Sequence, residues 1–211
     1  MNKIRTNFEG QTIYIGMDVH KSSWNLGIHL NDIFVKNVHQ KPNPQLMVDY
    51  LHKNFPGAIY KAAYEAGKFG FWIQRQLTAS GINCLVVNPA DIPKSQKDSL
   101  QKTDPRDARN ISLRLQSGFL RGIHIPDEQQ EADRVLFRHR KKILKDLNRC
   151  KNRIKGLLAF TGIDIPEPYD NANWSHNFIN WLKALDCKQT ARRRALDYQI
   201  RQMEFMRKEL L

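Results

Sequence analysis

The 211-residue chain carries 34 Lys and Arg against 21 Asp and Glu, a formal net charge of +13, and this excess predicts a polyanionic partner, with nucleic acid the first candidate. No run of about eighteen apolar residues exists and the N-terminal residues are polar, so we expect neither a membrane span nor a signal segment, and a cytoplasmic protein. Cys84, Cys150 and Cys187 lie far apart without CxxC spacing, so the sequence suggests neither a disulfide framework nor a zinc site.

The first predicted elements form a three-stranded antiparallel meander. Residues 12–18 are nearly continuously apolar, as in a strand buried in the middle of a sheet, and Asp18 ends them. Residues 24–30 alternate apolar and polar positions, and residues 33–38 follow the tight-turn pair Asn31-Asp32. The meander therefore carries a carboxylate on its first, central strand.

Helices and strands then alternate. From Gln45 the apolar residues recur at three and four positions, which predicts an amphipathic helix that Pro56-Gly57 ends. Residues 58–64 predict a fourth strand with Glu65 at its C-terminal end. A helix that carries Leu77 and a buried fifth strand at residues 82–87 follow.

A long surface loop is expected over residues 88–103, and a helix begins near Asp104 and ends at the C-cap Gly118. The order of elements is then βββαβαβα, which predicts an α/β sandwich with a mixed sheet. Asp18 lies on the first strand, Glu65 ends the fourth, and Asp104 and Asp107 lie on the last helix.

Beyond residue 126 the pattern becomes all-helical. A heptad-like apolar stripe predicts one long helix from about Glu128 to Phe160; its members are Leu136, Ile143, Leu147, Cys150, Ile154 and Leu157. Between Arg134 and Lys155 ten basic residues stand against one acid. A second helix from Gln189 to Leu211 either closes on the first as an antiparallel pair or pairs with a second protomer. Because the pattern stops inside this helix, we expect the region to be truncated.

The spacing of Asp104 and Asp107 places both carboxylates on one face of a helix. Taken alone, Asp104-Pro105-Arg106-Asp107 favours a helix start, with Asp104 as N-cap, Pro105 at N1 and an acid at N3. The alternative is a pair of metal ligands, since Mg²⁺ prefers carboxylate oxygens and a two-metal site needs several of them.

Asp18 and Glu65 have similar alternatives. A strand-end Asp commonly accepts hydrogen bonds from backbone amides, but an Asp that finishes an apolar central strand is costly to bury without a compensating charge. Glu65 is either an exposed strand-end acid or a ligand. The joint placement of the four acids favours a metal site over four separate structural roles.

Four local motifs carry a family resemblance. They are Gly16-Met17-Asp18-Val19-His20-Lys21, Tyr64-Glu65-Ala66-Gly67, Asn88-Pro89, and Lys102-Thr103-Asp104 followed by Asp107-Ala108. In this order the chain resembles the DEDD transposases of bacterial insertion sequences (the one-hundred-and-ten family), relatives of the pilin-gene invertase. The resemblance implies an RNase H/RuvC-like fold and covers residues 12 to about 125, extending less specifically into the basic helical region.

The resemblance implies a DNA transposase or site-specific recombinase in which Asp18, Glu65, Asp104 and Asp107 are catalytic and bind Mg²⁺, with Mn²⁺ as a substitute. In that family a C-terminal serine domain, absent from this sequence, also takes part in cleavage, and a structured non-coding RNA guides the reaction. We expect a RuvC-like catalytic domain at 1–125 and a coiled-coil-like basic region at 126–211. The alternatives are a junction nuclease or a catalytically incomplete RNA- and DNA-binding, oligomerising fragment.

Nucleic acid is expected at two places, with a homo-oligomer formed through the helical region. In the first domain Lys94, Lys97, Lys102, Arg106 and Arg109 lie close to the acids in sequence, where they are either phosphate contacts or a solvated loop. The long helix supplies Arg138, Arg140, Lys141, Lys142, Lys145, Arg149, Lys151, Arg153 and Lys155. A bound polyanion offsets their mutual repulsion, and an RNA duplex is a fair candidate.

His20 is expected to be structural and is left out of the catalytic set. Bound to DNA, the protein is expected at the bacterial nucleoid.

Overall fold

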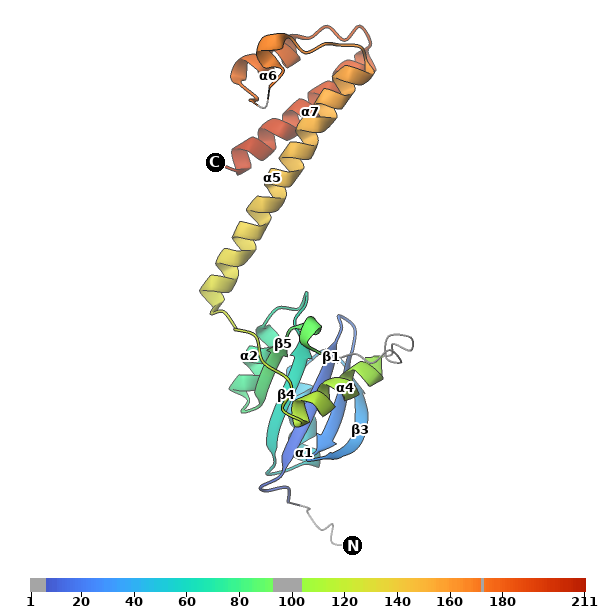
Figure 1. Ribbon diagram of the computed structural model, residues 1–211, viewed down its shortest axis with the longest axis vertical. Coiled ribbons are helices and arrows are strands. Elements are labelled where there is room, and N and C mark those ends of the chain that lie inside the picture. Colours follow the sequence, from blue (N-terminus) through green and yellow to red (C-terminus); the bar gives the residue numbers. More distant parts are fainter. Residues whose placement is uncertain (1–6, 93–103, 172) are drawn as a thin grey trace. The chain divides into compact units, whose positions relative to one another are not determined.

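The structure is a computed structural model that describes residues 7–92, 104–171 and 173–211. The chain divides into two compact units, Met1–Ile125 and Pro126–Leu211 (Figure 1). Each unit has its own hydrophobic core, so each is treated by itself below.

The first unit is built on a five-stranded mixed sheet. Its strands are β1 (Thr12–Val19), β2 (Trp24–Leu30), β3 (Ile33–Gln40), β4 (Ile59–Glu65) and β5 (Asn83–Val87). The spatial order is β3-β2-β1-β4-β5, with β1, β2 and β3 antiparallel and β4 and β5 parallel to β1. The predicted mixed α/β fold is confirmed, and it is RNase H-like, with β1 at the centre.

Helices cover both faces of this sheet. Ile13, Ile15 and Met17 point to the face covered by α1 (Pro44–Asn54) and α2 (Trp72–Ala79), where they join the main core. Because side chains alternate along a strand, Gly16 and Asp18 point to the opposite face, which α4 (Asp104–Gln116) covers (Figure 1). The alternation of β1 thus directs its one carboxylate toward the last helix of the unit.

Two glycines allow α4 to lie directly on the sheet. Gly16 of β1 pairs with Gly27 of β2. A Cβ atom built on Gly16 would lie 2.1 Å from the carbonyl oxygen of Ala108, and one on Gly27 would lie 2.6 Å from Cα of Arg109. These are backbone atoms of a helix, so they cannot move aside as a flexible side chain could, and only glycine fits at both positions.

A buried polar contact also holds α4 on β2. His29, 3% exposed, follows a register shift in the β2–β3 pairing, and its Nδ1 lies 2.8 Å from Oγ of Ser112, which is fully buried. The Ser112 hydroxyl donates to the carbonyl oxygen of Arg109 at 2.8 Å, so it accepts the proton of His29 Nδ1. Burial, with a smaller contribution from the Arg109 charge, lowers the pKa of His29, which favours this neutral form.

Both ends of α4 can be compared with the predicted N-cap at Asp104 and the predicted C-cap at Gly118. Gly118 ends it with a φ of 74°; its N–H donates to Leu115, and that of Phe119 donates to Arg114, the pattern of a Schellman cap. At the other end the helix begins at Asp104 itself, one residue earlier than an Asp104 N-cap implies. Both acids lie in the first turn, as predicted, where they interact favourably with the helix dipole.

The loop before α4 contains one short element. Pro89–Asp91 forms the 3-10 helix η1, and Oδ1 of Asn88 accepts a hydrogen bond from the N–H of Ala90. The remainder of the predicted loop, residues 93–103, lies outside the described residues.

The second unit consists of helices: α5 (Glu128–Phe160), the 3-10 helix η2 (Glu167–Tyr169), α6 (His176–Ala184) and α7 (Thr190–Glu209). Oδ1 of Asp127 caps α5 through the N–H of Gln130 at 2.7 Å, and Oγ of Ser175 caps α6. Arg193 of α7 donates to the carbonyl oxygens of Leu182 and Leu185, which ties the start of α7 to the end of α6.

The two long helices pack on each other, the first of the two arrangements that the sequence left open (Figure 1). Sγ of Cys150 approaches the carbonyl oxygen of Gln199, whereas Leu210 lies beside Phe137 and Leu144, so the pair is antiparallel. The core between them includes Leu147, Cys150, Ile154 and Leu158 of α5 and Leu196, Ile200, Met203 and Met206 of α7.

The predicted apolar stripe of α5 is only partly buried. Leu147, Cys150 and Ile154 enter the core, but Leu136 is 68% exposed, and the fully buried residue at the C-terminal end is Leu158 rather than Leu157. The buried residues Leu147, Cys150, Ile154 and Leu158 step by three, four and four residues along α5, so the buried face follows the helical period and reaches Leu158.

All three cysteines are buried and none forms a disulfide. Among the described residues, no helix combines the length and apolar character needed to cross a membrane.

Candidate metal centre

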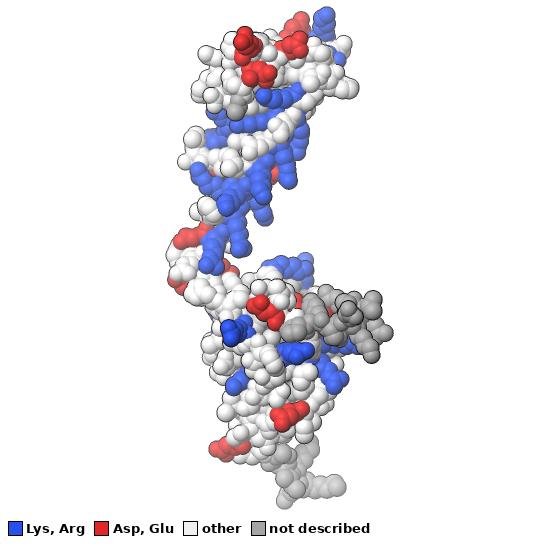
Figure 2. All heavy atoms as spheres, in the orientation of Figure 1, with Lys and Arg blue, Asp and Glu red and all other residues white. Residues whose placement is uncertain are grey.

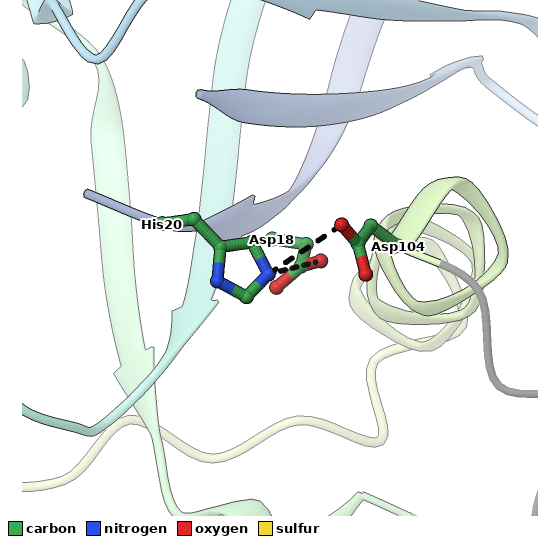
Figure 3. A group of neighbouring side chains, drawn as sticks. All are labelled: Asp18, His20 and Asp104. Carbon is green, nitrogen blue, oxygen red and sulfur yellow. Dashed lines mark hydrogen bonds and ion pairs between the residues drawn. The ribbon is translucent and has the colours of Figure 1, made fainter. Parts of the chain in front are cut away.

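Three side chains from two elements of the first unit converge beside the sheet. Nε2 of His20 lies 3.1 Å from Oδ2 of Asp18 and 3.7 Å from Oδ2 of Asp104 (Figure 3). One potential ligand atom from each residue lies within 4.8 Å of the other two. Asp18 comes from the end of β1, His20 follows that strand, and Asp104 opens α4.

Glu65 is brought to the same place by strand register. Met17 of β1 pairs with Tyr64 of β4 in the parallel register. Asp18 and Glu65, which follow them, therefore lie side by side on neighbouring strands. Gly16 and Ala63 lie on the face that α4 covers. Asp18 and Glu65 come two residues after them, so their side chains point to the same face. The carboxyl ends of parallel strands are a common place for a ligand site.

The acids line one cleft of about 270 Å³. Asp18, Glu65, Asp104 and Asp107 all contribute to its wall. Glu65 and Asp107 are not part of the tighter group of Asp18, His20 and Asp104. The structure therefore gathers all four predicted acids around one cleft, with two of them in direct proximity.

The pKa of Asp18 reflects the crowding of carboxylates in this cleft. Its side chain is 20% exposed. Burial raises the pKa of Asp18 above its ordinary value; the charge and hydrogen bond of His20 lower it, while the charges of Asp104 and Asp107 raise it further. A largely buried carboxylate next to two others is stabilised in its charged form by a cation, so the donor set fits a hard divalent metal ion.

Sequence reasoning set aside or missed two residues of the cleft. His20, expected to be structural, lies within the acidic group, where its Nε2–H donates to the carboxylate of Asp18. Its signal was the spacing Asp18-x-His20 at the end of a strand. Lys68 lines the cleft from the turn after β4, and its Nζ lies 5.3 Å from the ring centroid of Phe69. No pattern in the sequence singled out Lys68.

The basic residues predicted near the acids have different positions. Arg106 is exposed in the first turn of α4. Arg109 lies with its guanidinium carbon 4.1 Å from the ring centroid of Phe34 on β3, so it packs on the sheet edge. Lys94, Lys97 and Lys102 lie outside the described residues.

Lys and Arg side chains gather on the surface of the long helices of the second unit (Figure 2), and most of the basic residues predicted on α5 are exposed. Two of them have acid partners: Nη1 of Arg149 lies 2.9 Å from Asp146, and Nζ of Lys155 lies 3.5 Å from Asp170. Burial lowers the pKa of the partly buried Lys151, and the charge of Arg207 adds to this. The exposed members are Arg138, Arg140, Lys141, Lys142, Lys145, Arg149 and Arg153.

An RNase H-like sheet whose central strand ends in Asp, with further acids on β4 and on the helix that covers that face, defines a nuclease-like class of protein. Comparison with known proteins specifies the class. The family model of the IS110-type DEDD transposases, described as a transposase, matches residues 15–163, and the chain belongs to this family.

Relatives among the curated proteins agree with this. The chain is similar to the transposase for insertion sequence element IS1533 of Leptospira borgpetersenii, 29% identical over 178 residues, which cover 82% of this chain and 50% of that protein. It is also similar to the putative transposase y4rJ of Sinorhizobium fredii (strain NBRC 101917 / NGR234), 38% identical over 111 residues, covering 49% and 28%. The putative transposase y4qE of the same strain is 31% identical over 120 residues, covering 57% and 30%. The chain thus spans half or less of the length of these relatives.

Proposed function

We propose that this chain is the N-terminal part of a DNA transposase whose first unit, residues 1–125, is the catalytic domain. Asp18, Glu65, Asp104 and Asp107 would bind Mg²⁺, or Mn²⁺ in its place. The observation that carries the proposal is the convergence of Asp18 and Asp104 on His20 in a cleft that Glu65 and Asp107 also line. Membership of a transposase family supports DNA as the substrate.

Each residue has a distinct part in the proposed site. The hydrogen bond from His20 fixes the rotamer of Asp18, and the start of α4 presents Asp104 and Asp107 from one helical turn. Lys68 lies at the wall of the cleft, where an ammonium group can contact a phosphate. When bound, the divalent cation supplies electrostatic stabilisation of the charge that develops on the phosphodiester during cleavage.

The rest of the reaction is also a proposal. The chain spans at most half of its curated relatives, which supports a further domain, and the family resemblance implies that this domain carries a serine needed for strand transfer. The same resemblance implies a structured guide RNA. We assign its binding, and homo-oligomer formation, to residues 126–211, because the exposed cations of α5 form a surface suited to phosphates.

Metal binding and DNA nicking test the catalytic proposal separately. Mg²⁺ and Mn²⁺ are expected to raise the melting temperature of the 211-residue chain, and Asp104→Asn to abolish both this shift and Mg²⁺-dependent nicking of supercoiled DNA. Asp49→Asn, at an exposed acid of α1, is the matched control and is expected to retain both.

The outcomes separate the alternatives. A metal-induced shift without nicking identifies a catalytically incomplete fragment that needs the rest of the transposase. If the chain cleaves branched DNA but does not nick supercoiled DNA, it is a junction nuclease. If the shift persists after Asp18→Asn and Asp104→Asn are combined, the four acids do not form a metal site.

A further inference from the structure

Helix α7 carries a line of alternating basic and aromatic residues that the metal centre and the basic surface of α5 do not include. Arg194, Tyr198, Arg201, Phe205 and Lys208 follow one another at steps of four, three, four and three residues. This spacing places all five on one face of a helix. All five are exposed, and the two aromatic side chains are each 64% exposed. We call this set the α7 stripe.

The α7 stripe takes no part in the core of the unit. The buried residues of α7 are Leu196, Ile200, Met203 and Met206, which pack toward α5 and α6. Single exposed apolar residues are ordinary, but two large aromatic rings in line between three cations form a patterned surface. A function on the surface is therefore a better explanation than a role in folding.

The geometry of the stripe suits stacked bases and phosphates. The guanidinium carbon of Arg201 lies 4.9 Å from the ring centroid of Tyr198. Unpaired bases stack on aromatic rings and on arginine planes, while cations beside them hold the backbone. Tyr198 and Phe205 are separated by about 10 Å along the helix axis, which leaves room for a different base on each ring.

The charges around the stripe remain available to a polyanion. Three acids of α7 lie near it in sequence. Asp197 pairs with Arg193 and Glu204 with Lys183, both cations outside the stripe, although Arg201 also acts on the charge of Asp197. The third, Glu209, is exposed next to Lys208, so the stripe keeps a net positive charge. Aromatic residues and Arg also occur at protein interfaces. The stripe adds three cations to a chain whose net charge is already +13, and this excess favours a polyanion as its partner.

We propose that the α7 stripe binds single-stranded nucleic acid, with unpaired bases stacked on Tyr198 and Phe205 and phosphates bound by Arg194, Arg201 and Lys208. In a duplex the faces of the bases are hidden, so the rings favour unpaired strands. The proposal rests on the assignment of nucleic-acid binding to residues 126–211 and deepens it, because it names a second surface, on α7, that takes unpaired strands.

The test measures binding of an unstructured oligonucleotide, as RNA and as DNA, and of a duplex by the 211-residue chain in EDTA, so that cleavage plays no part. Tyr198→Leu with Phe205→Leu keeps the apolar area but removes the π faces, and is expected to lower single-strand affinity about tenfold. Tyr198→Trp with Phe205→Trp is expected to retain it. Neither pair alters duplex binding or the salt dependence, because no charge is removed.

The choice of strand identifies the natural source. If the Leu pair loses affinity for both single-stranded RNA and single-stranded DNA, the site recognises only bases and phosphates. If it loses affinity for one of them, that nucleic acid is the ligand of the site. Arg194→Gln with Arg201→Gln is expected to reduce the slope of log K against log salt by about 0.7 per residue.

Phe160→Leu is the matched control, because Phe160 is 88% exposed at the end of α5 and outside the stripe. It is expected to leave all affinities unchanged. Circular dichroism checks that the helices persist in each variant. Single-strand binding by the Leu pair equal to that of the parent overturns the proposal. A Leu pair that changes the oligomeric state but keeps single-strand binding also overturns the proposal, because the rings would then contact a second copy of the chain.

Discussion

Gly16 of β1 and Gly27 of β2 face each other across the antiparallel pair, and a Cβ atom on either would collide with the backbone of α4. The two glycines form the surface on which α4 rests. Since Asp104 belongs to α4 and Asp18 lies two residues beyond Gly16, this close approach sets the distance between the two carboxylates. The packing of a helix on glycines thus determines the geometry of the candidate metal centre.

Replacing Gly16 by Ala is expected to destabilise the first unit by roughly 3 kcal/mol, because its Cβ would lie 2.1 Å from the oxygen of Ala108 and 2.3 Å from the nitrogen of Ser112. Urea denaturation measures the change, and metal affinity is expected to fall with it. Gly156→Ala is the control: the position is open and lies within α5, so it should gain about 1 kcal/mol. A Gly16→Ala variant with unchanged stability would show that α4 does not need this contact.

Asp18→Asn is expected to raise the melting temperature in metal-free buffer. It removes a carboxylate whose pKa is raised by burial and by the charges of Asp104 and Asp107, while an amide oxygen can still accept a hydrogen bond from His20. Addition of Mg²⁺ should stabilise the parent and leave the variant unchanged. Scanning calorimetry with and without metal measures both effects. A lower melting temperature without metal would contradict the proposed repulsion.

His20→Ala is expected to reduce metal affinity or nicking by about 10–100-fold, the usual cost of losing a group that orients a ligand. The reason is that its Nε2, 3.1 Å from Asp18, holds that carboxylate in place. His20→Gln should recover part of the loss, since its amide can also donate. Titration calorimetry with Mn²⁺ measures the affinities. Equal affinity in the Ala variant and the parent would return His20 to the purely structural role expected from the sequence.

The buried His29 predicts a pH dependence of stability. Burial, followed by the charge of Arg109, lowers its pKa from the ordinary value of 6.5, so on acidification the unfolded state takes up the proton first. This contribution is fully present above pH 6.5 and is lost as pH falls through the lowered pKa, by at most about 1.4 kcal/mol per pH unit. His29→Gln keeps an N–H donor but does not titrate.

Urea midpoints of the parent and of His29→Gln, measured from about pH 7.5 to about pH 5, give the comparison. We expect the stability of the parent to fall more steeply than that of the variant. Parallel curves would mean that other groups carry the acid sensitivity of the first unit.

Reversing Lys141, Lys142 and Lys145 to Glu is expected to weaken binding of structured RNA and to flatten its salt dependence, because the three exposed cations would no longer displace counterions. The slope of log K against log salt should fall by about 2–3. Filter binding across a salt series measures it. Reversal of Lys53, an exposed cation of α1, is the control. An unchanged slope would remove this part of α5 from the interface.

Much of this architecture follows from local pattern. The apolar run of β1, the alternation of β2 and the glycine after α4 predict their elements, because periodicity and turn chemistry depend on residues close in sequence. The order of elements then predicts the sheet and the common location of Asp18 and Glu65. The long helix α5 was also evident from its heptad-like spacing, although Leu136, expected in its apolar seam, is exposed.

Tertiary structure decided what depends on distant residues. The contact between His29 and Ser112 joins positions 83 residues apart, and the requirement for glycine at Gly16 comes from a helix that begins 88 residues later. His20 became part of the acidic group only when α4 brought Asp104 to it. The sequence by itself determined which elements form and which acids they carry, because these depend on neighbours along the chain. Only the folded structure decided how closely those acids approach one another, because that distance is set by the packing of one backbone on another.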